Sequence, residues 1–234
     1  MRPAVESESA PQMPGFTLAP APANSADAAN IRERFNNALA GCSPEKFFGY
    51  DAAFPPHRLQ QWRNVLNMVK SQPVDGVLRL VNGFFNTWPS TEDKDNYGAA
   101  DYWARPEEFV QHKGGDCEDY VIIKYLALRS LSFPAGNMWM FMVFDRARAG
   151  YHAVLAVNAG GRLFFLDNLT KPAYLLMPEN IFLKNFIPLC AVNENGLWVY
   201  SSPEADKERT RALARKKNRS GSPGEGTPIL PEAR

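Results

Sequence analysis

The sequence predicts an α+β fold in which helices come first and an antiparallel sheet follows. Apolar residues recur with a helical period up to about residue 131, and the period then changes to two, which is typical of strands. Gly160-Gly161 and Asn195-Gly196 separate later apolar segments, and such pairs favour tight hairpin turns. Helices followed by strands that hairpins connect indicate an α+β layout.

The helical part contains amphipathic segments and one segment that is apolar on nearly every side. The apolar segment begins after a glycine pair and should be a buried central helix. We expect helices over 30–39, 57–70, 74–88 and 106–112, and the apolar helix from Asp116 to about 131. We expect strands over 138–144, 151–158, 162–169, 186–192 and 197–201.

Composition divides the chain into one domain and two polar ends. Residues 1–28 are rich in Pro, Ala and Ser, and we expect a disordered lead-in. Residues 29–201 hold the apolar segments and should form one domain. Residues 202–234 carry a basic run and a Pro/Gly-rich end, so we expect a disordered tail whose part 204–217 could form a frayed helix.

Charge and hydropathy exclude several classes of partner. The 234 residues carry a formal net charge of +1, so we expect no nucleic acid partner. No run of about 18 apolar residues occurs, so we expect no transmembrane segment. The first residues lack the apolar core of a signal peptide, so this pattern does not predict export.

Cys117 is the cysteine whose surroundings indicate chemistry. The chain has three cysteines, and an odd number argues against a disulfide framework. Cys190 lies in an apolar strand and is typical of a core residue, whereas Cys117 stands at the start of the apolar helix. The unpaired N–H groups and the dipole of a helix start favour a thiolate, so Cys117 is a candidate nucleophile.

His152 is the best candidate for a base. His57 stands at a helix start and should be a surface residue, and His112 lies on an expected loop with no obvious orienting carboxylate. His152 begins a strand, where a lone histidine is often only a satisfied edge residue. The register of the following hairpin therefore has to decide its role.

That register places an acidic residue beside His152. If Gly160-Gly161 closes the turn, Val154 faces Asp167, and His152 and Asp167 become diagonal neighbours on one face of the sheet. Such neighbours lie about 7–8 Å apart at the backbone, which allows a side-chain hydrogen bond. Asp167 alone could simply end a strand, but together with His152 and the helix-start cysteine it completes a nucleophile, a base and an orienting group.

The acidic residues around Cys117 raise an electrostatic problem. Asp116, Glu118 and Asp119 should disfavour a thiolate by like-charge repulsion. They could simply cap the helix and complement its dipole. Alternatively, a hard cation such as Ca²⁺ could bind their oxygens and cancel the repulsion, although the spacing is not that of an EF-hand.

Several ordered motifs resemble those of the bacterial transglutaminase-like cysteine proteinases. They are VNGFFN at 81–86, DYWARP at 101–106, GGDCEDY at 114–120, KY at 124–125, HAVL at 152–155 and LDN at 166–168. The similarity spans about residues 54–200. It implies a papain/transglutaminase-like fold with the nucleophile helix packed on the antiparallel sheet, and a triad that falls on Cys117, His152 and Asp167.

The resemblance also implies a cofactor, a substrate and a partner. The acidic residues that the family uses for calcium fall on Asp116, Glu118 and Asp119. The best-known members are periplasmic proteases that cut a large surface adhesin and release biofilm cells, and a membrane receptor for cyclic di-GMP sequesters them. We therefore expect a calcium-dependent cysteine endopeptidase. The resemblance implies the periplasm, whereas the lack of a signal-peptide pattern would fit the cytoplasm. The basic tail departs from the family pattern.

Two other functions fit the same residues. An acyl transferase would use an identical triad but resolve the acyl-enzyme with an amine instead of water. A non-catalytic, calcium-dependent binding module could keep the fold, although the complete triad argues against it.

Overall fold

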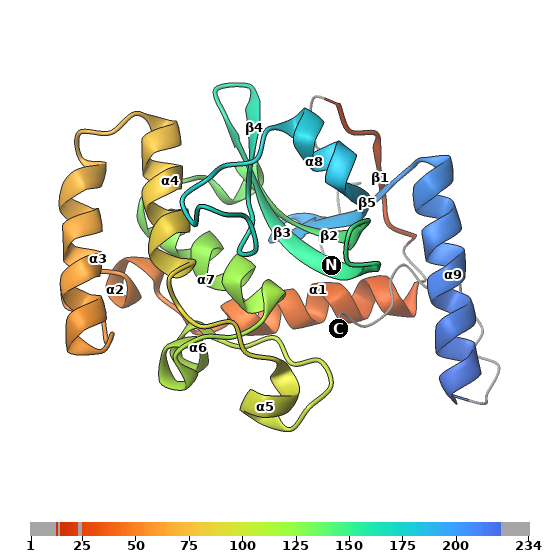
Figure 1. Cartoon of the computed structure of the whole chain (residues 1–234), viewed down its shortest axis with the longest axis horizontal. Coiled ribbons are helices and arrows are strands. Elements are labelled where there is room, and N and C mark those ends of the chain that lie inside the picture. Colours follow the sequence, from red (N-terminus) through yellow and green to blue (C-terminus); the bar gives the residue numbers. More distant parts are fainter. Residues whose placement is uncertain (1–12, 14, 23–24, 221–234) are drawn as a thin grey trace, which may run out of the picture.

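A six-stranded antiparallel sheet forms the centre of the computed structural model, which describes residues 13, 15–22 and 25–220 (Figure 1). The strands follow the order β1-β6-β5-β2-β3-β4. They are β1 (Leu18–Pro20), β2 (Met138–Asp145), β3 (Gly150–Ala159), β4 (Arg162–Leu166), β5 (Phe186–Asn193) and β6 (Gly196–Tyr200). The predicted α+β layout is confirmed, with most helices before the five main strands.

The helices agree with the predicted segments where these are long. They are α1 (Ala26–Leu39), α2 (Pro44–Phe47), α3 (Pro56–Val69), α4 (Val74–Phe85), α5 (Asp93–Tyr97), α6 (Pro106–His112), α7 (Cys117–Ser130), α8 (Glu179–Asn185) and α9 (Pro203–Ser220). The short helices α2, α5 and α8 were not predicted, whereas α6, which is as short as α8 but begins with a proline, was.

Helix α7 is the buried centre of the larger core. It packs against β3 on one side and against α1, α2, α4 and α6 on others, which explains why most of its residues are buried. The glycine pair before it is required by close packing. A Cβ at Gly114, whose φ is +151°, would lie 2.0 Å from the Pro89 carbonyl oxygen. This contact fixes where α7 begins and therefore where Cys117 stands.

The β3–β4 hairpin has the predicted register. Ala159 pairs with Arg162 and Leu155 with Leu166, and the two turn glycines have positive φ angles of 61° and 77°. Two successive residues with positive φ suit glycine and a tight turn. Strand β4 ends at Leu166, three residues earlier than expected, so Asp167 lies at the first position after the strand.

Both polar ends contribute more structure than their composition predicts. Within the expected lead-in, Leu18–Pro20 pairs with β6, and Met13 and Phe16 are buried against the sheet face that α8 also covers. Within the expected tail, α9 packs on β5, and Arg209 donates hydrogen bonds to the carbonyls of Leu189 (3.2 Å) and Tyr200 (2.8 Å). Tertiary contacts stabilise these segments, so the folded part extends beyond 29–201. Residues 1–12, 14, 23–24 and 221–234 lie outside the described residues, so the predictions for them stay predictions.

Hydropathy gives no membrane-crossing helix in the described part of the chain. None of its helices combines sufficient length with sufficient apolar character to span a bilayer.

Candidate active site

The hairpin brings His152 and Asp167 into direct contact. The distance from His152 Nε2 to Asp167 Oδ1 is 2.8 Å, and both residues are buried. Asp167 Oδ1 also accepts from the Leu169 N–H (3.1 Å), and Oδ2 accepts from the Thr170 hydroxyl (2.6 Å). Burial alone would raise the pKa of Asp167. The hydrogen bond from His152 and the charge of that histidine, together with the hydrogen bonds from Thr170 and Leu169, instead hold this pKa well below its usual value.

This contact determines which nitrogen of His152 is left for chemistry. An ionised carboxylate only accepts hydrogen bonds, so Nε2 carries the proton that it donates to Asp167. In the neutral imidazole, Nδ1 then has the free lone pair and can accept a proton.

Asn82 of α4 and Asn86, the C-cap residue of that helix, hold the segment that follows Asp167. Asn86 Nδ2 donates to the carbonyls of Asp167 and Ala173, both at 2.8 Å. Asn82 Nδ2 donates to the carbonyls of Ala173 (3.1 Å) and Leu175 (3.0 Å). The sequence prediction did not single out either residue, although two buried amides four positions apart on an apolar helix are a signal that could have been used.

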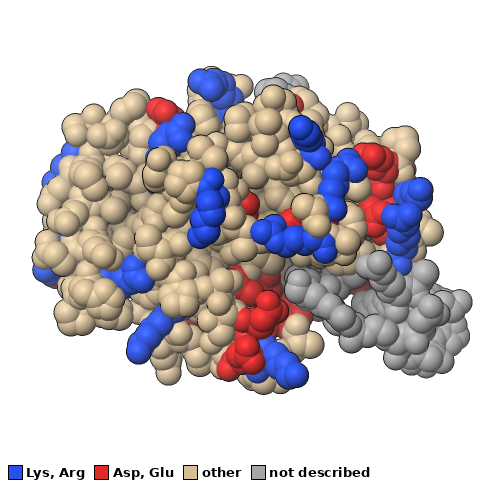
Figure 2. Space-filling view, in the orientation of Figure 1, with Lys and Arg blue, Asp and Glu red and all other residues tan. Residues whose placement is uncertain are grey.

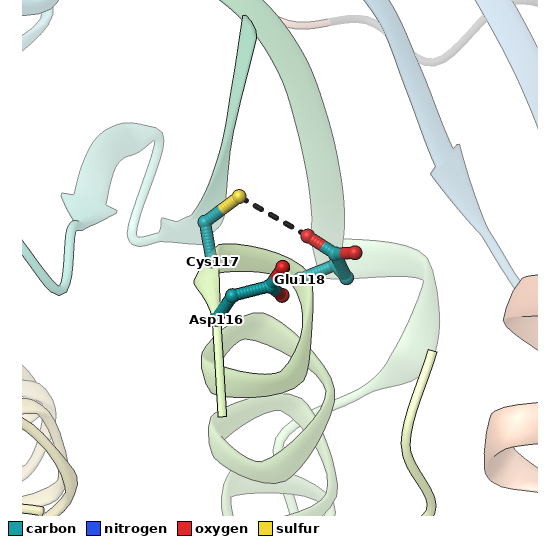
Figure 3. A group of neighbouring side chains, drawn as sticks. All are labelled: Asp116, Cys117 and Glu118. Carbon is teal, nitrogen blue, oxygen red and sulfur yellow. Dashed lines mark hydrogen bonds between the residues drawn. The ribbon is translucent and has the colours of Figure 1, made fainter. Parts of the chain in front are cut away.

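Cys117 is the first residue of α7, and Asp116 is its N-cap. Its thiol lies 3.1 Å from Glu118 Oε2, and Figure 3 shows the sulfur directed at that carboxyl group. The N–H of Ala153, which follows His152, donates a hydrogen bond to the sulfur. Cys117 therefore lies beside β3, although no hydrogen bond joins it to His152 in the described part of the structure.

The acidic neighbours oppose ionisation of this thiol. Burial raises the pKa of Cys117 well above its ordinary value, and the negative charges of Glu118 and Asp116 raise it further. The predicted repulsion is thus present. With this charge distribution, the protonated thiol is the favoured form.

The acidic residues form a larger cluster than the sequence indicated. Ligand atoms lie within 4.8 Å of one another in the groups Asp93–Asp116–Asp119 and Asp93–Asp101–Glu118. Asp93, in α5, and Asp101, after it, were missed because both belong to a polar stretch far from Cys117 in the sequence. Acidic side chains also gather on the surface around α5 (Figure 2).

Several oxygens of this cluster are buried without a partner. Asp93 Oδ1, Asp116 Oδ1 and Glu118 Oε1 have no hydrogen-bond partner among the described residues. Burial is the main reason that the pKa of each of these carboxyl groups is raised, and their mutual repulsion adds to it. Buried carboxylates normally have a compensating charge or donor.

Asp119 has a structural task as well. Its Oδ1 accepts from the Ala104 N–H (2.7 Å), and its Oδ2 accepts from the Asp116 N–H (3.3 Å) as part of a capping box. The capping interpretation of the acidic residues therefore holds for Asp116, which is the N-cap, and for Asp119, its partner in the capping box. Asp116, at the N-cap, and Glu118 keep an oxygen for another partner.

The donor set of this cluster fits a hard cation. All of its ligand atoms are carboxylate oxygens, which Ca²⁺ prefers, and three of them lack any other partner among the residues described. A cation there would supply the positive charge that the raised pKa values indicate is missing. Asp93 of α5 and Asp101 of the segment after it add carboxyl groups to Asp116, Glu118 and Asp119. Together they offer a calcium ion more ligands than the three residues near Cys117 would offer alone.

The other histidines lie on the surface. His57 is exposed on α3, as expected. His112 is exposed at the end of α6, where its ring lies 4.8 Å from that of Tyr97. Neither has the buried carboxylate partner that His152 has.

The fold and the helix-start cysteine beside a histidine are those of a transglutaminase-like cysteine peptidase, and comparisons with known proteins agree. Residues 57–199 match the family described as bacterial transglutaminase-like cysteine proteinase BTLCP, and the chain belongs to this family. It is therefore a cysteine peptidase. A search of curated proteins found no match.

Solved structures of LapG from Legionella pneumophila are similar to this chain. One LapG structure has 25% sequence identity and a TM-score of 0.56, with 75% of this chain and 97% of that chain covered. EGTA-treated LapG has 26% identity and a TM-score of 0.56, with 69% and 87% covered. Calcium-bound LapG, at 24% identity and a TM-score of 0.53, shares the fold, with 76% and 97% covered.

Proposed function

We propose that this peptidase is a calcium-dependent endopeptidase with Cys117 as nucleophile, His152 as base and Asp167 as the group that orients the base. The observation that carries the proposal is the 2.8 Å contact between His152 and Asp167, on the strand whose next N–H binds the Cys117 sulfur. This arrangement supplies a nucleophile, a base and an orienting carboxylate from three separate segments.

The reaction follows from these positions. His152 Nδ1 takes the thiol proton, the Cys117 sulfur bonds to the amide carbon, and the carbonyl π electrons move to oxygen. The Cys117 N–H, at the open start of α7, is the proposed donor to that oxyanion. The C–N bond then breaks as His152 returns the proton to the leaving amine. Water, deprotonated by His152, cleaves the thioester and restores the thiol.

The proposed calcium ligands are Asp93, Asp116 and Glu118, with Asp101 and Asp119 beside them. Bound Ca²⁺ would supply positive charge next to the nucleophile and remove the repulsion that now favours the protonated thiol. The orphaned carboxyl oxygens support this proposal. LapG, for which a calcium-bound structure exists, is a related case.

Family membership also supports a biological role. We propose a large cell-surface adhesin as the protein substrate, the periplasm as the compartment and an inhibitory cyclic di-GMP receptor as a partner. The release of cells from a biofilm would follow from cleavage of such an adhesin. Comparing adhesin retention on cells with and without the gene tests this role directly.

Replacement of the nucleophile tests the chemistry. With calcium present, Cys117→Ala should lower the rate of cleavage of a protein substrate by about a thousandfold or more, because the covalent route is lost. Cys42→Ala, which replaces a half-buried cysteine outside the proposed triad and the acidic cluster, is the matched control and should keep full activity. Cleavage by Cys117→Ala at the normal rate would overturn the proposal. Formation of amine adducts on a glutamine peptide would instead indicate acyl transfer.

A further inference from the structure

Lys124 is a buried cation that the proposed reaction does not use. Its side chain is fully buried in α7, and its Nζ has no hydrogen-bond partner among the described residues. The residue follows Cys117 by two helical turns, so both lie on one side of α7, the side on which Cys117 meets Ala153 of β3. A buried ammonium group is costly, and an apolar side chain would fill the same space at lower cost.

Two groups face the Lys124 ammonium. The ring of Tyr120, one turn earlier on α7, lies 5.4 Å from Nζ and offers its negative face. The charge of Asp167 favours the protonated lysine from the segment after β4. Asp167 already receives hydrogen bonds from His152, Leu169 and Thr170, so Lys124 acts on it through charge.

The other charged groups near α7 lie in its first turn, form an ion pair with another residue or lie near the surface. The acidic cluster occupies the first turn of α7, and Asp145 of β2 forms an ion pair with Arg148. The charged residues of the helices packed on α7 lie at or near the surface: Asp27, Arg32, Glu33 and Arg34 of α1, Glu45 and Lys46 of α2, Asp75 and Arg79 of α4, and Glu107 and Glu108 of α6.

His152 faces a small set of groups as well. They are the carboxylate of Asp167, at 2.8 Å, and the ring of Phe186, at 5.8 Å, while the Cys117 sulfur accepts from the N–H of the next residue, Ala153. The Asp167 carboxylate is thus the charged group in contact with the imidazole, and the charge of Lys124 acts on that same carboxylate.

We propose that Lys124 is a positioning residue of the active site, whose buried ammonium group acts through Asp167 to disfavour protonation of His152 and so keeps the imidazole available as a base. The inference rests on the proposed roles of His152 and Asp167. Asp167 holds the ring in place through its hydrogen bond, and Lys124 adds positive charge on the same carboxylate without breaking that bond.

The effect should depend on pH. Burial lowers the pKa of Lys124 to about 7, and the charge of Asp167 opposes that fall. A lysine is charged below its pKa, so the ammonium group acts on His152 on the acid side of neutrality and loses its charge above it. The influence of Lys124 should therefore be greatest below pH 7.

A histidine titration tests the charge effect without any need for activity. The chain has three histidines, and in a Cys117→Ala background their ring signals can be followed by NMR as the pH changes. Lys124→Met should raise the pKa of His152 by about half a unit or more, because a nearby positive charge is removed. The exposed His57 and His112 serve as internal controls. An unchanged His152 pKa would overturn the inference.

A second variant separates charge from packing. Leu128→Met alters a buried residue one turn further along the same side of α7 without changing charge, and it should leave the His152 titration unchanged. A shift as large as that of Lys124→Met would show that packing alone is responsible. If Lys124→Met does not fold, Lys124→Gln removes the same charge while keeping a polar side chain, and the titration is repeated with it.

Activity then tests whether the charge matters for the reaction. With Cys117 intact and calcium present, Lys124→Met should move the acid limb of the kcat/KM profile to higher pH, and the two profiles should converge above about pH 8. A loss that is equal at every pH would contradict the proposed role. Should Cys117→Ala prove active, the proposed function fails while the titration result stands by itself.

Discussion

The two halves of the active site differ in how far the chain completes them. On the sheet side, both oxygens of Asp167 are hydrogen-bonded and His152 is held by one of them. On the helix side, carboxyl groups around Cys117 are buried with oxygens that have no partner among the residues described. The proposed base, His152, is held in place by the chain itself, whereas the proposed nucleophile, Cys117, lies in a region that lacks compensating positive charge.

This difference gives each half a different dependence on conditions. The pKa of Asp167 is lowered, so the His152–Asp167 contact persists at neutral pH and is lost only as the pH falls through the acid range. The pKa values of Asp93, Asp116 and Glu118 are raised, so ionisation of the cluster opposes folding as the pH rises. Calcium should matter to the second half and not to the first.

The largest effect on the reaction rate should come from a change on the sheet side of the site, where Asp167 holds His152. Asp167→Asn should lower kcat by about 10⁴-fold, because an amide can donate to His152 and hold the wrong tautomer. The change in rate is measured on a protein substrate with saturating calcium. Asp75→Asn, on the exposed surface of α4, is the control and should leave the rate unchanged. A kcat within tenfold of the unaltered protein would mean that His152 needs no orienting carboxylate.

A smaller effect should come from the acidic residue that the sequence did not reveal. Asp93→Asn should raise the calcium concentration for half-maximal activity by about tenfold or more, because one charged ligand becomes neutral. Asp95→Asn, two residues along and exposed in the same helix, is the matched control. Equal calcium requirements for the two variants would remove Asp93 from the proposed site.

The smallest effect should appear in stability. Burial raises the pKa of Asp116 from 3.8 to about 7, so the folded state holds a proton that the unfolded chain releases. Calcium-free protein should therefore melt at a lower temperature at pH 8 than at pH 5, by about 4 °C or more. Calcium should remove most of this difference, as measured by thermal unfolding in calcium and in EGTA. A melting temperature that falls equally with and without calcium would show that the cluster is not the cause.

The sequence predicted the parts of the site that depend on local structure. The hairpin register follows from a two-glycine turn and alternating side chains, so the His152–Asp167 contact could be inferred before any tertiary contact was known. The helix start at Cys117 follows from the glycine break and the apolar run after it. Asp93 and Asp101 could not be inferred in this way, because no local rule relates α5 to the start of α7.

By itself, the sequence determined the α+β layout, the candidate triad and the family resemblance, because periodicity, turn residues and short motifs act over a few residues. Only the tertiary structure decided which acidic residues share one cluster and which of their oxygens lack partners. It also decided that residues 18–20 form an edge strand and that Lys124 is buried near the Tyr120 ring without a hydrogen-bond partner among the described residues. These features depend on segments that are distant in the sequence and that come together only when apolar surfaces pack around α7.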